Sequence, residues 1–185
     1  LKKAYAGGKE LAGKTLGIIG FGKIGQEVAK RAIGLGMNVL THDKFTTEAS
    51  ITLSFFNGDK KTFTIETTSL ENVLEGSDFV TLHIPKTGEK AVIGAEEIGL
   101  MKTGAGIINT ARGGVIDEDA LMFALDKGKL EYAALDVFTN EPNPSMYLMM
   151  HNSISLTPHI GAATLEAQDR IGAELADKII TFFNK

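Results

Sequence analysis

Three clusters of polar residues carry the side chains that could do chemistry in this chain. The first contains Arg112, the second Asp136 and Glu141, and the third His159. An arginine can hold a substrate carboxylate through two parallel hydrogen bonds. A histidine can carry a proton near neutral pH, and a carboxylate beside it fixes its tautomer and favours its charged form. These residue types therefore indicate proton transfer on a substrate that bears a carboxylate.

A fourth motif, nearer the N-terminus, predicts a dinucleotide site. Gly20, Gly22 and Gly25 follow a short apolar run with G-x-G-x-x-G spacing, and Asp43 follows a second apolar run. The three glycines suit a tight turn, close approach of a pyrophosphate and close packing of a helix. The helix N-terminus attracts phosphate, and the Asp43 carboxylate can accept both ribose hydroxyls and repel a 2′-phosphate. The motif predicts NAD, rather than NADP, as the cofactor.

Alternating strands and helices must position these residues, which predicts an α/β fold of the Rossmann type with a doubly wound parallel sheet. The predicted strands cover residues 16–19, 37–40, 78–84, 106–109, 132–137 and 154–157. The predicted helices cover residues 26–35, 70–75, 94–101, 117–127 and 162–183, with Ser69 and Asp117 as N-caps of the second and fourth. Each polar cluster follows a strand, at the edge of the sheet where ligands bind in such folds. Residues 1–14 are interpreted as a connector and residues 15–185 as a single nucleotide-binding domain.

A β-hairpin insertion is predicted near residues 50–67. Apolar residues occupy the odd positions on both sides of a turn signal at 57–59, namely Ile51, Leu53, Phe55, Phe63 and Ile65. Odd positions on both arms share one face only if the numbers of paired residues add up to an even number. A two-residue Asn-Gly loop would pair 55 with 60 and break this rule. We therefore expect a loop of odd length or a bulge.

The composition argues against several classes of function. The 185 residues are 43% hydrophobic and 23% charged, with a net charge of −4 and no basic run, so nucleic acid and anionic membranes are poor partners. The chain has no cysteine, and its four histidines lack the spacing of metal ligands on one helix, so neither disulfides nor a metal are predicted. No apolar run approaches ~20 residues and no signal peptide is visible, which leaves a cytoplasmic protein as the expectation. Because the chain begins with Leu1, we expect a fragment or a processed product.

The motifs together resemble the NAD-binding domain of the D-isomer-specific 2-hydroxyacid dehydrogenases. Segments 109–117, 134–138 and 157–162 read Asn-Thr-Ala-Arg-Gly-Gly-Val-Ile-Asp, Ala-Leu-Asp-Val-Phe and Thr-Pro-His-Ile-Gly-Ala, in that order after the glycine motif. The resemblance extends over nearly the whole chain. Segment 161–168 most resembles the D-3-phosphoglycerate dehydrogenase branch. Residues 50–67 depart from the family, because they are longer and more strand-like than its short helical segment.

The resemblance implies a catalytic set of Arg112, Glu141 and His159. In this family the histidine takes the hydroxyl proton while hydride leaves C2 for the nicotinamide, the glutamate bonds the histidine, and the arginine holds the substrate. The implied cofactor-binding residues, which overlap this set, are Gly20, Gly22, Lys23, Ile24, Gly25, Asp43, Thr110, Ala111, Arg112, Asp136, His159, Ile160, Gly161 and Ala162.

The resemblance also implies what this chain acts on and with. The expected substrate is a D-2-hydroxy acid, with D-3-phosphoglycerate first, which would place the reaction at the start of serine biosynthesis. Glycerate, lactate and glyoxylate or hydroxypyruvate remain alternatives, as does a non-catalytic NAD-sensing module. Family members have a second, substrate-binding domain that these residues do not supply, and they usually form homodimers through the nucleotide-binding domain.

Overall fold

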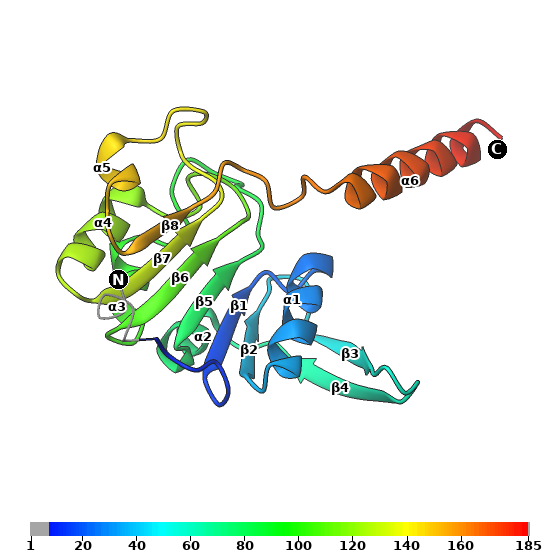
Figure 1. Cartoon of the computed structure of the whole chain (residues 1–185), viewed down its shortest axis with the longest axis horizontal. Helices are drawn as coiled ribbons and strands as arrows, with labels where there is room; N and C mark the ends of the chain where they lie inside the picture. The colour runs from blue at the N-terminus through cyan, green and yellow to red at the C-terminus, as the bar shows by residue number, and fades with distance from the viewer. Residues whose placement is uncertain (1–7, 185) are drawn as a thin grey trace.

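The computed structural model describes residues 8–184 as a parallel sheet with helices on both faces (Figure 1). The strands of this sheet are β1 Thr15–Ile19, β2 Asn38–His42, β5 Phe79–Leu82, β6 Ala105–Asn109, β7 Leu130–Leu135 and β8 Ile154–Leu156. They lie in the order β2-β1-β5-β6-β7-β8, and every neighbouring pair is parallel. The predicted doubly wound parallel sheet is therefore confirmed. Residues 1–7, half of the predicted connector, lie outside the described residues.

Successive side chains of a strand in this sheet pack alternately against the helices on one face and the helices on the other. The helices are α1 Lys23–Gly34, α2 Leu70–Gly76, α3 Ala95–Leu100, α4 Glu118–Asp126, α5 Met146–Met149 and α6 Leu165–Phe183. On β1, Leu16 and Ile18 pack with buried alanines of α1, whereas Ile19 belongs to the cluster that contains the buried side chains of α2, α3 and α4. Successive strand residues point to opposite faces, so one apolar run can bury both sides of the sheet.

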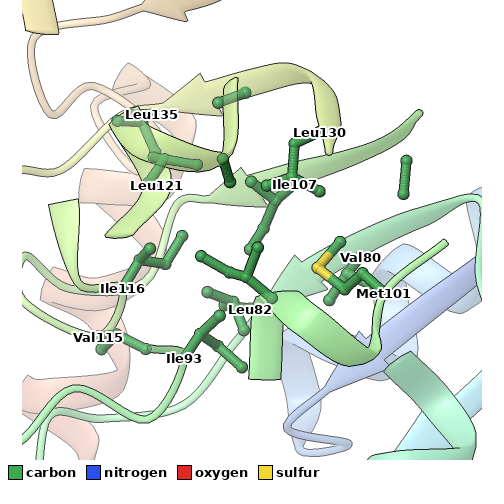
Figure 2. Close-up of a cluster of buried hydrophobic side chains, with 14 of the residues drawn as sticks. Val80, Leu82, Ile93, Met101, Ile107, Val115, Ile116, Leu121, Leu130 and Leu135 are labelled. Atoms are coloured by element: carbon green, nitrogen blue, oxygen red, sulfur yellow. The ribbon is translucent and has the colours of Figure 1, made fainter. Parts of the chain in front are cut away.

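The larger cluster lies between the sheet and helices α2 to α4 (Figure 2). Val80 and Leu82 of β5 are fully buried there, as is Leu121 of α4, and Ile107 of β6 is 1% exposed. Each such side chain contributes about 1.5–3 kcal/mol to folding by leaving water. This packing holds the carboxyl ends of the central strands in fixed positions, and the predicted site residues follow those ends.

The order of the strands reverses between β1 and β5. The chain leaves β1 for β2 on one side and returns to β5 on the other. The loops that follow β1 and β5 touch, because a Cβ atom at Gly20 would lie 2.5 Å from the carbonyl oxygen of His83. Ligands of open α/β sheets bind at such a reversal, outside the carboxyl ends of the strands.

The predicted hairpin insertion is confirmed, with antiparallel strands β3 Glu48–Ser54 and β4 Lys60–Glu66. Ile51 pairs with Phe63 and Ser54 pairs with Lys60, so the paired numbers have an even sum, and residues 55–59 form an odd-length loop. The buried side chain of Ile51 packs in the α1 layer. Phe55, which the alternation placed on the same face, is half exposed because it lies in the loop beyond the last strand pair.

Three helices differ from the prediction. Helix α1 starts at Lys23, three residues early, because Gly22 is its extended N-cap and Gly25 lies in its first turn. Helix α5 was not predicted at all; the Ser145 hydroxyl caps it by accepting a hydrogen bond from the Leu148 N–H. Helix α6 starts at Leu165, with Thr164 as its N-cap, and none of its side chains is buried. It projects away from the body of the molecule (Figure 1).

Within residues 8–184, no helix combines the length and the apolar character needed to cross a membrane.

Candidate active site

The turn between β1 and α1 has the geometry that a dinucleotide pyrophosphate requires. Gly20 has a φ of 98°, in the left-handed region, and a Cβ atom at Gly25 would lie 2.1 Å from the Gly20 carbonyl oxygen. A Cβ atom at Gly22 would meet no described atom within 4 Å, so the backbone is open to a ligand there. Lys23 and Ile24 begin α1 and are exposed, and the first turn of this helix contains no acid. The positive end of the helix dipole is therefore available to phosphate.

Asp43 lies beside this turn and ties it to the end of β2. Its Oδ2 accepts the N–H of Phe21 at 2.7 Å, and its Oδ1 accepts the N–H groups of Phe45 at 2.8 Å and Thr46 at 2.9 Å. Burial favours the neutral acid, but these three donors outweigh it and hold the pKa of Asp43 below its ordinary value. The carboxylate is therefore charged and fixed in place, with one lone pair of Oδ2 still able to accept a ribose hydroxyl.

The segment after β6 is shaped by Asn109, whose side chain is 2% exposed. Its Oδ1 accepts the Ala111 N–H at 3.0 Å, and its Nδ2 donates to the Arg112 carbonyl at 3.0 Å. These two bonds fold Thr110, Ala111 and Arg112 into a turn at the edge of the sheet. The Arg112 side chain is exposed, and its Nη1 donates to the Ala111 carbonyl. Its remaining donors can bind a carboxylate that approaches from solvent.

Asp136, at the end of β7, organises the segment that carries His159. Its Oδ1 accepts the Thr157 hydroxyl at 2.6 Å and the Ile160 N–H at 2.9 Å, and its Oδ2 accepts the Gly161 N–H at 2.8 Å. Burial raises the pKa of this carboxyl, but the three donors prevail and the pKa lies below its ordinary value. These bonds lie on both sides of His159 in the sequence. The φ of His159 is 55°, in a region that residues other than glycine seldom adopt. Asp136 therefore holds the histidine in a strained backbone conformation.

Glu141 and His159 form a direct pair. The Glu141 Oε2 lies 2.7 Å from the His159 Nδ1, and its Oε1 accepts the Phe138 N–H at 2.9 Å. The imidazole beside it, followed by the Phe138 N–H, lowers the pKa of Glu141, so the carboxylate is charged and can only accept. The His159 Nδ1 must then carry the proton in this bond. Neutral His159 consequently presents the lone pair of Nε2, which is the geometry of a general base.

The loops of Arg112 and Glu141 meet at Gly113. A Cβ atom at Gly113 would lie 1.7 Å from the Phe138 carbonyl oxygen and 2.3 Å from its carbon. Only a residue without a side chain allows this approach, so Gly113 sets the spacing between the Arg112 loop and the Glu141 loop. Sequence reasoning placed Arg112, Glu141 and His159 at one rim, and the structure shows direct contact between Glu141 and His159.

The other predicted cofactor residues occupy the same carboxyl edge. Thr110 is exposed, Ala111 is 9% exposed, and the N–H groups of Ile160 and Gly161 bind Asp136, with Ala162 following. Sequence reasoning did not assign a role to the side chain of Asn109. An amide at the last position of a buried strand, where it can bond the next turn, was the available signal.

The fold, the open glycine turn and the carboxylate beside it define the nucleotide-binding domain of a dehydrogenase. The sequence model described as "D-isomer specific 2-hydroxyacid dehydrogenase, NAD binding domain" matches residues 2–161. The chain belongs to this family, and NAD is its cofactor.

Individual relatives agree with this assignment. The chain is 45% identical over 182 residues to a hydroxypyruvate reductase of Thermotoga maritima, covering 96% of this chain and 55% of the relative. It is 43% identical over 175 residues to D-3-phosphoglycerate dehydrogenase 3, chloroplastic, of Arabidopsis thaliana, covering 94% and 28%. A solved structure of D-lactate dehydrogenase from Aquifex aeolicus with NAD and lactic acid has a TM-score of 0.75 at 33% identity, covering 96% of this chain and 55% of that one. The chain thus spans about half or less of the length of these relatives.

Proposed function

We propose that this chain is the NAD-binding half of an oxidoreductase that transfers hydride between NAD and C2 of a D-2-hydroxy acid. The observation that carries the proposal is the 2.7 Å contact between Glu141 Oε2 and His159 Nδ1 at the carboxyl edge of the sheet. Bound NAD supplies the hydride acceptor. In oxidation the C2–H bond breaks as hydride leaves, the hydroxyl proton passes to His159 Nε2, and a C2 carbonyl forms; reduction reverses each change. Glu141 stabilises the imidazolium that forms during oxidation.

The remaining residues bind and orient. Arg112 holds the substrate carboxylate through its guanidinium fork, and the N–H groups at the start of α1 hold the pyrophosphate. When NAD is bound, Asp43 would accept a ribose hydroxyl at the free lone pair of Oδ2. The 110–112 turn and the 159–162 segment would hold the nicotinamide. Asp136 can accept the carboxamide N–H at Oδ2, which holds one donor within the protein.

D-3-phosphoglycerate is the first candidate substrate, and its oxidation would begin serine biosynthesis. Relatives named D-3-phosphoglycerate dehydrogenase, 43% identical in Arabidopsis thaliana and 42% identical in Bacillus subtilis, support this choice. Hydroxypyruvate, reduced to D-glycerate, is the second candidate, because the Thermotoga maritima relative carries that activity in its name at 45% identity. The pairing of Glu141 with His159 favours catalysis over NAD sensing alone, since sensing needs no proton carrier.

The test is a panel of 2-hydroxy and 2-keto acids with NAD or NADH, using this domain joined to a substrate-binding domain. We expect turnover of D-3-phosphoglycerate in preference to D-glycerate, D-lactate and glyoxylate. His159→Gln is the matched control, because it should abolish turnover and leave NAD affinity nearly unchanged. Tight NAD binding with no turnover of any acid would instead support a sensing module.

The 185-residue chain by itself should bind NADH and should not turn over any of these acids. In the proposed enzyme the described residues would supply one wall of a cleft, and productive geometry with exclusion of water needs a second wall. Substantial turnover by this chain alone would show that the second wall is not required. Homodimerisation through this domain and a cytoplasmic location stay predictions; sedimentation of the purified domain tests the first.

A further inference from the structure

We propose that Glu118 is a positioning residue that sets the placement of the Glu141–His159 pair. Glu118 is the first residue of α4, and its Oε1 accepts the N–H of Thr139 at 2.6 Å. Thr139 lies 21 residues further along the chain than Glu118, in the loop that follows β7 and leads to Glu141. A carboxylate that accepts a backbone N–H forms one of the stronger hydrogen bonds available in proteins.

The peptide group between Phe138 and Thr139 is held from both sides. The carbonyl of Phe138 and the N–H of Thr139 belong to one planar peptide group. On one side this group packs against Gly113, where a Cβ atom would lie 1.7 Å from the carbonyl oxygen and 3.0 Å from the Thr139 nitrogen. The N–H binds Glu118. Contact at Gly113 limits how closely the group approaches, and the bond to Glu118 sets its rotation.

The rotation of this peptide group decides where the Glu141 carboxylate lies. Glu141 closes the loop on itself, because its Oε1 accepts the N–H of Phe138 while its Oε2 binds His159 Nδ1. The buried Phe138 side chain anchors the start of the loop in the core. If the Phe138–Thr139 peptide turns, ψ of Phe138 and φ of Thr139 change, so the chain from Thr139 to Glu141 moves relative to the Phe138 N–H and Glu141 loses one of its two fixed partners. Glu118 therefore acts on the histidine through the loop and not by touching it.

The same short segment also carries Arg112. Residues 112–118 run from Arg112, through the contact at Gly113, to Glu118, which binds the neighbouring loop. Two contacts at different points of this segment thus fix the Arg112 loop relative to the Glu141 loop. This inference rests on the proposed function only in treating the Glu141–His159 pair as the proton carrier. Its geometry can be tested without substrate.

The experiment measures amide hydrogen exchange and the ¹⁵N shifts of the His159 ring in the purified chain, for wild type, Glu118→Ala, Glu118→Gln and Asp119→Asn. In wild type, neutral His159 should be mainly the Nδ1–H tautomer. Glu118→Ala should cut the exchange protection of the Thr139 N–H at least about tenfold and move His159 towards the Nε2–H tautomer. Glu118→Gln keeps an acceptor oxygen and should restore both signals. Asp119→Asn, at an exposed neighbouring acid of the same helical turn, should change neither.

Two results would overturn the proposal. The first is a His159 tautomer in Glu118→Ala that is unchanged from wild type, because loss of Thr139 protection alone would show a structural bond with no effect on the pair. The second is a Glu118→Gln or Asp119→Asn variant that behaves like Glu118→Ala, which would show an effect of charge and not of position. Because no turnover is measured, a failure of the proposed activity leaves these outcomes unaffected.

Discussion

Asp43 should make the domain select NADH over NADPH, and the structure defines how its removal acts. The three backbone donors hold its carboxylate charged and immobile beside the glycine turn, where the adenosine ribose is proposed to lie. A 2′-phosphate would bring a second negative group to the same place. Two like unit charges ~4 Å apart repel by about 4 kcal/mol at an effective dielectric of ~20, and screening by salt reduces this value. We therefore expect NADPH to bind about 10²–10³-fold more weakly than NADH.

Asp43→Asn removes the charge but also disturbs the turn. The amide oxygen can still accept the N–H groups of Phe45 and Thr46, which leaves the amide nitrogen facing the N–H of Phe21, a donor against a donor. Leaving the Phe21 N–H unbonded costs about 1–3 kcal/mol, so affinity for both cofactors should fall. The preference for NADH, measured as the ratio of the two dissociation constants, is therefore the diagnostic quantity.

Titration calorimetry of the chain with NADH and NADPH, at low and high salt, measures this ratio. In Asp43→Asn the ratio should fall at least about tenfold, and in wild type it should shrink as salt rises. Asp59→Asn makes the same change of charge in the hairpin loop and should leave the ratio at the wild-type value. Equal affinity of wild type for both cofactors, or an unchanged ratio in Asp43→Asn, would refute the assignment of Asp43 to the ribose.

Three further predictions concern the carboxyl edge. Gly113→Ala should lower kcat/KM about 10²-fold in the domain joined to a substrate-binding domain, because its Cβ would overlap the Phe138 carbonyl and separate the Arg112 loop from the Glu141 loop. An unchanged kcat/KM in steady-state kinetics would show that the close approach of these two loops is not required. Glu141→Gln removes the charge beside His159, so the rate–pH profiles of oxidation and reduction should both move to lower pH, and profiles that stay in place would show that Glu141 does not govern the histidine. The pKa of Asp136 is lowered from 3.8 on folding, so the stability that it contributes is present above about pH 4 and is lost as the pH falls through its folded-state pKa. The free energy of unfolding in urea, measured from pH 7 down to pH 2, should fall less steeply for Asp136→Asn than for wild type. At pH 7 this variant should be less stable than wild type by about 1–3 kcal/mol. An equally steep fall in the free energy of unfolding would contradict the hydrogen bonds assigned to this carboxylate.

Much of the fold could be read from local patterns. The glycine spacing, the alternation of strands and helices, and the N-caps Ser69 and Asp117 depend on residues within a few positions of one another, and the structure confirms them. Both cap side chains accept the N–H three residues on, from Asn72 and Ala120. The even-sum rule for the hairpin also held, because a side-chain period of two constrains register before any tertiary contact forms.

Local patterns did not predict helix α5 or the first residue of α1, because loop signals overlap helix signals in both places. Two prolines, Pro142 and Pro144, favoured an irregular loop and concealed α5, whose single turn depends on the cap at Ser145. Helix α1 begins at Lys23 because the chain turns sharply at Gly20 and is helical directly after the extended Gly22, so Gly25 serves the first turn of the helix and not the loop.

The sequence by itself determined the class of fold, the cofactor motif and the residue types of the proposed catalytic set. Only the tertiary structure decided how those residues are held. Asp43 reaches Phe21 across 22 positions, Asp136 reaches Ile160 across 24, and Glu118 reaches Thr139 across 21. Such bonds depend on which strands are neighbours and on the path of each loop, and a periodic pattern of apolar residues encodes burial but not the partner of a particular polar atom. That is why Glu118 and Asn109 could be recognised as positioning groups only once the parallel strands had brought their loops together.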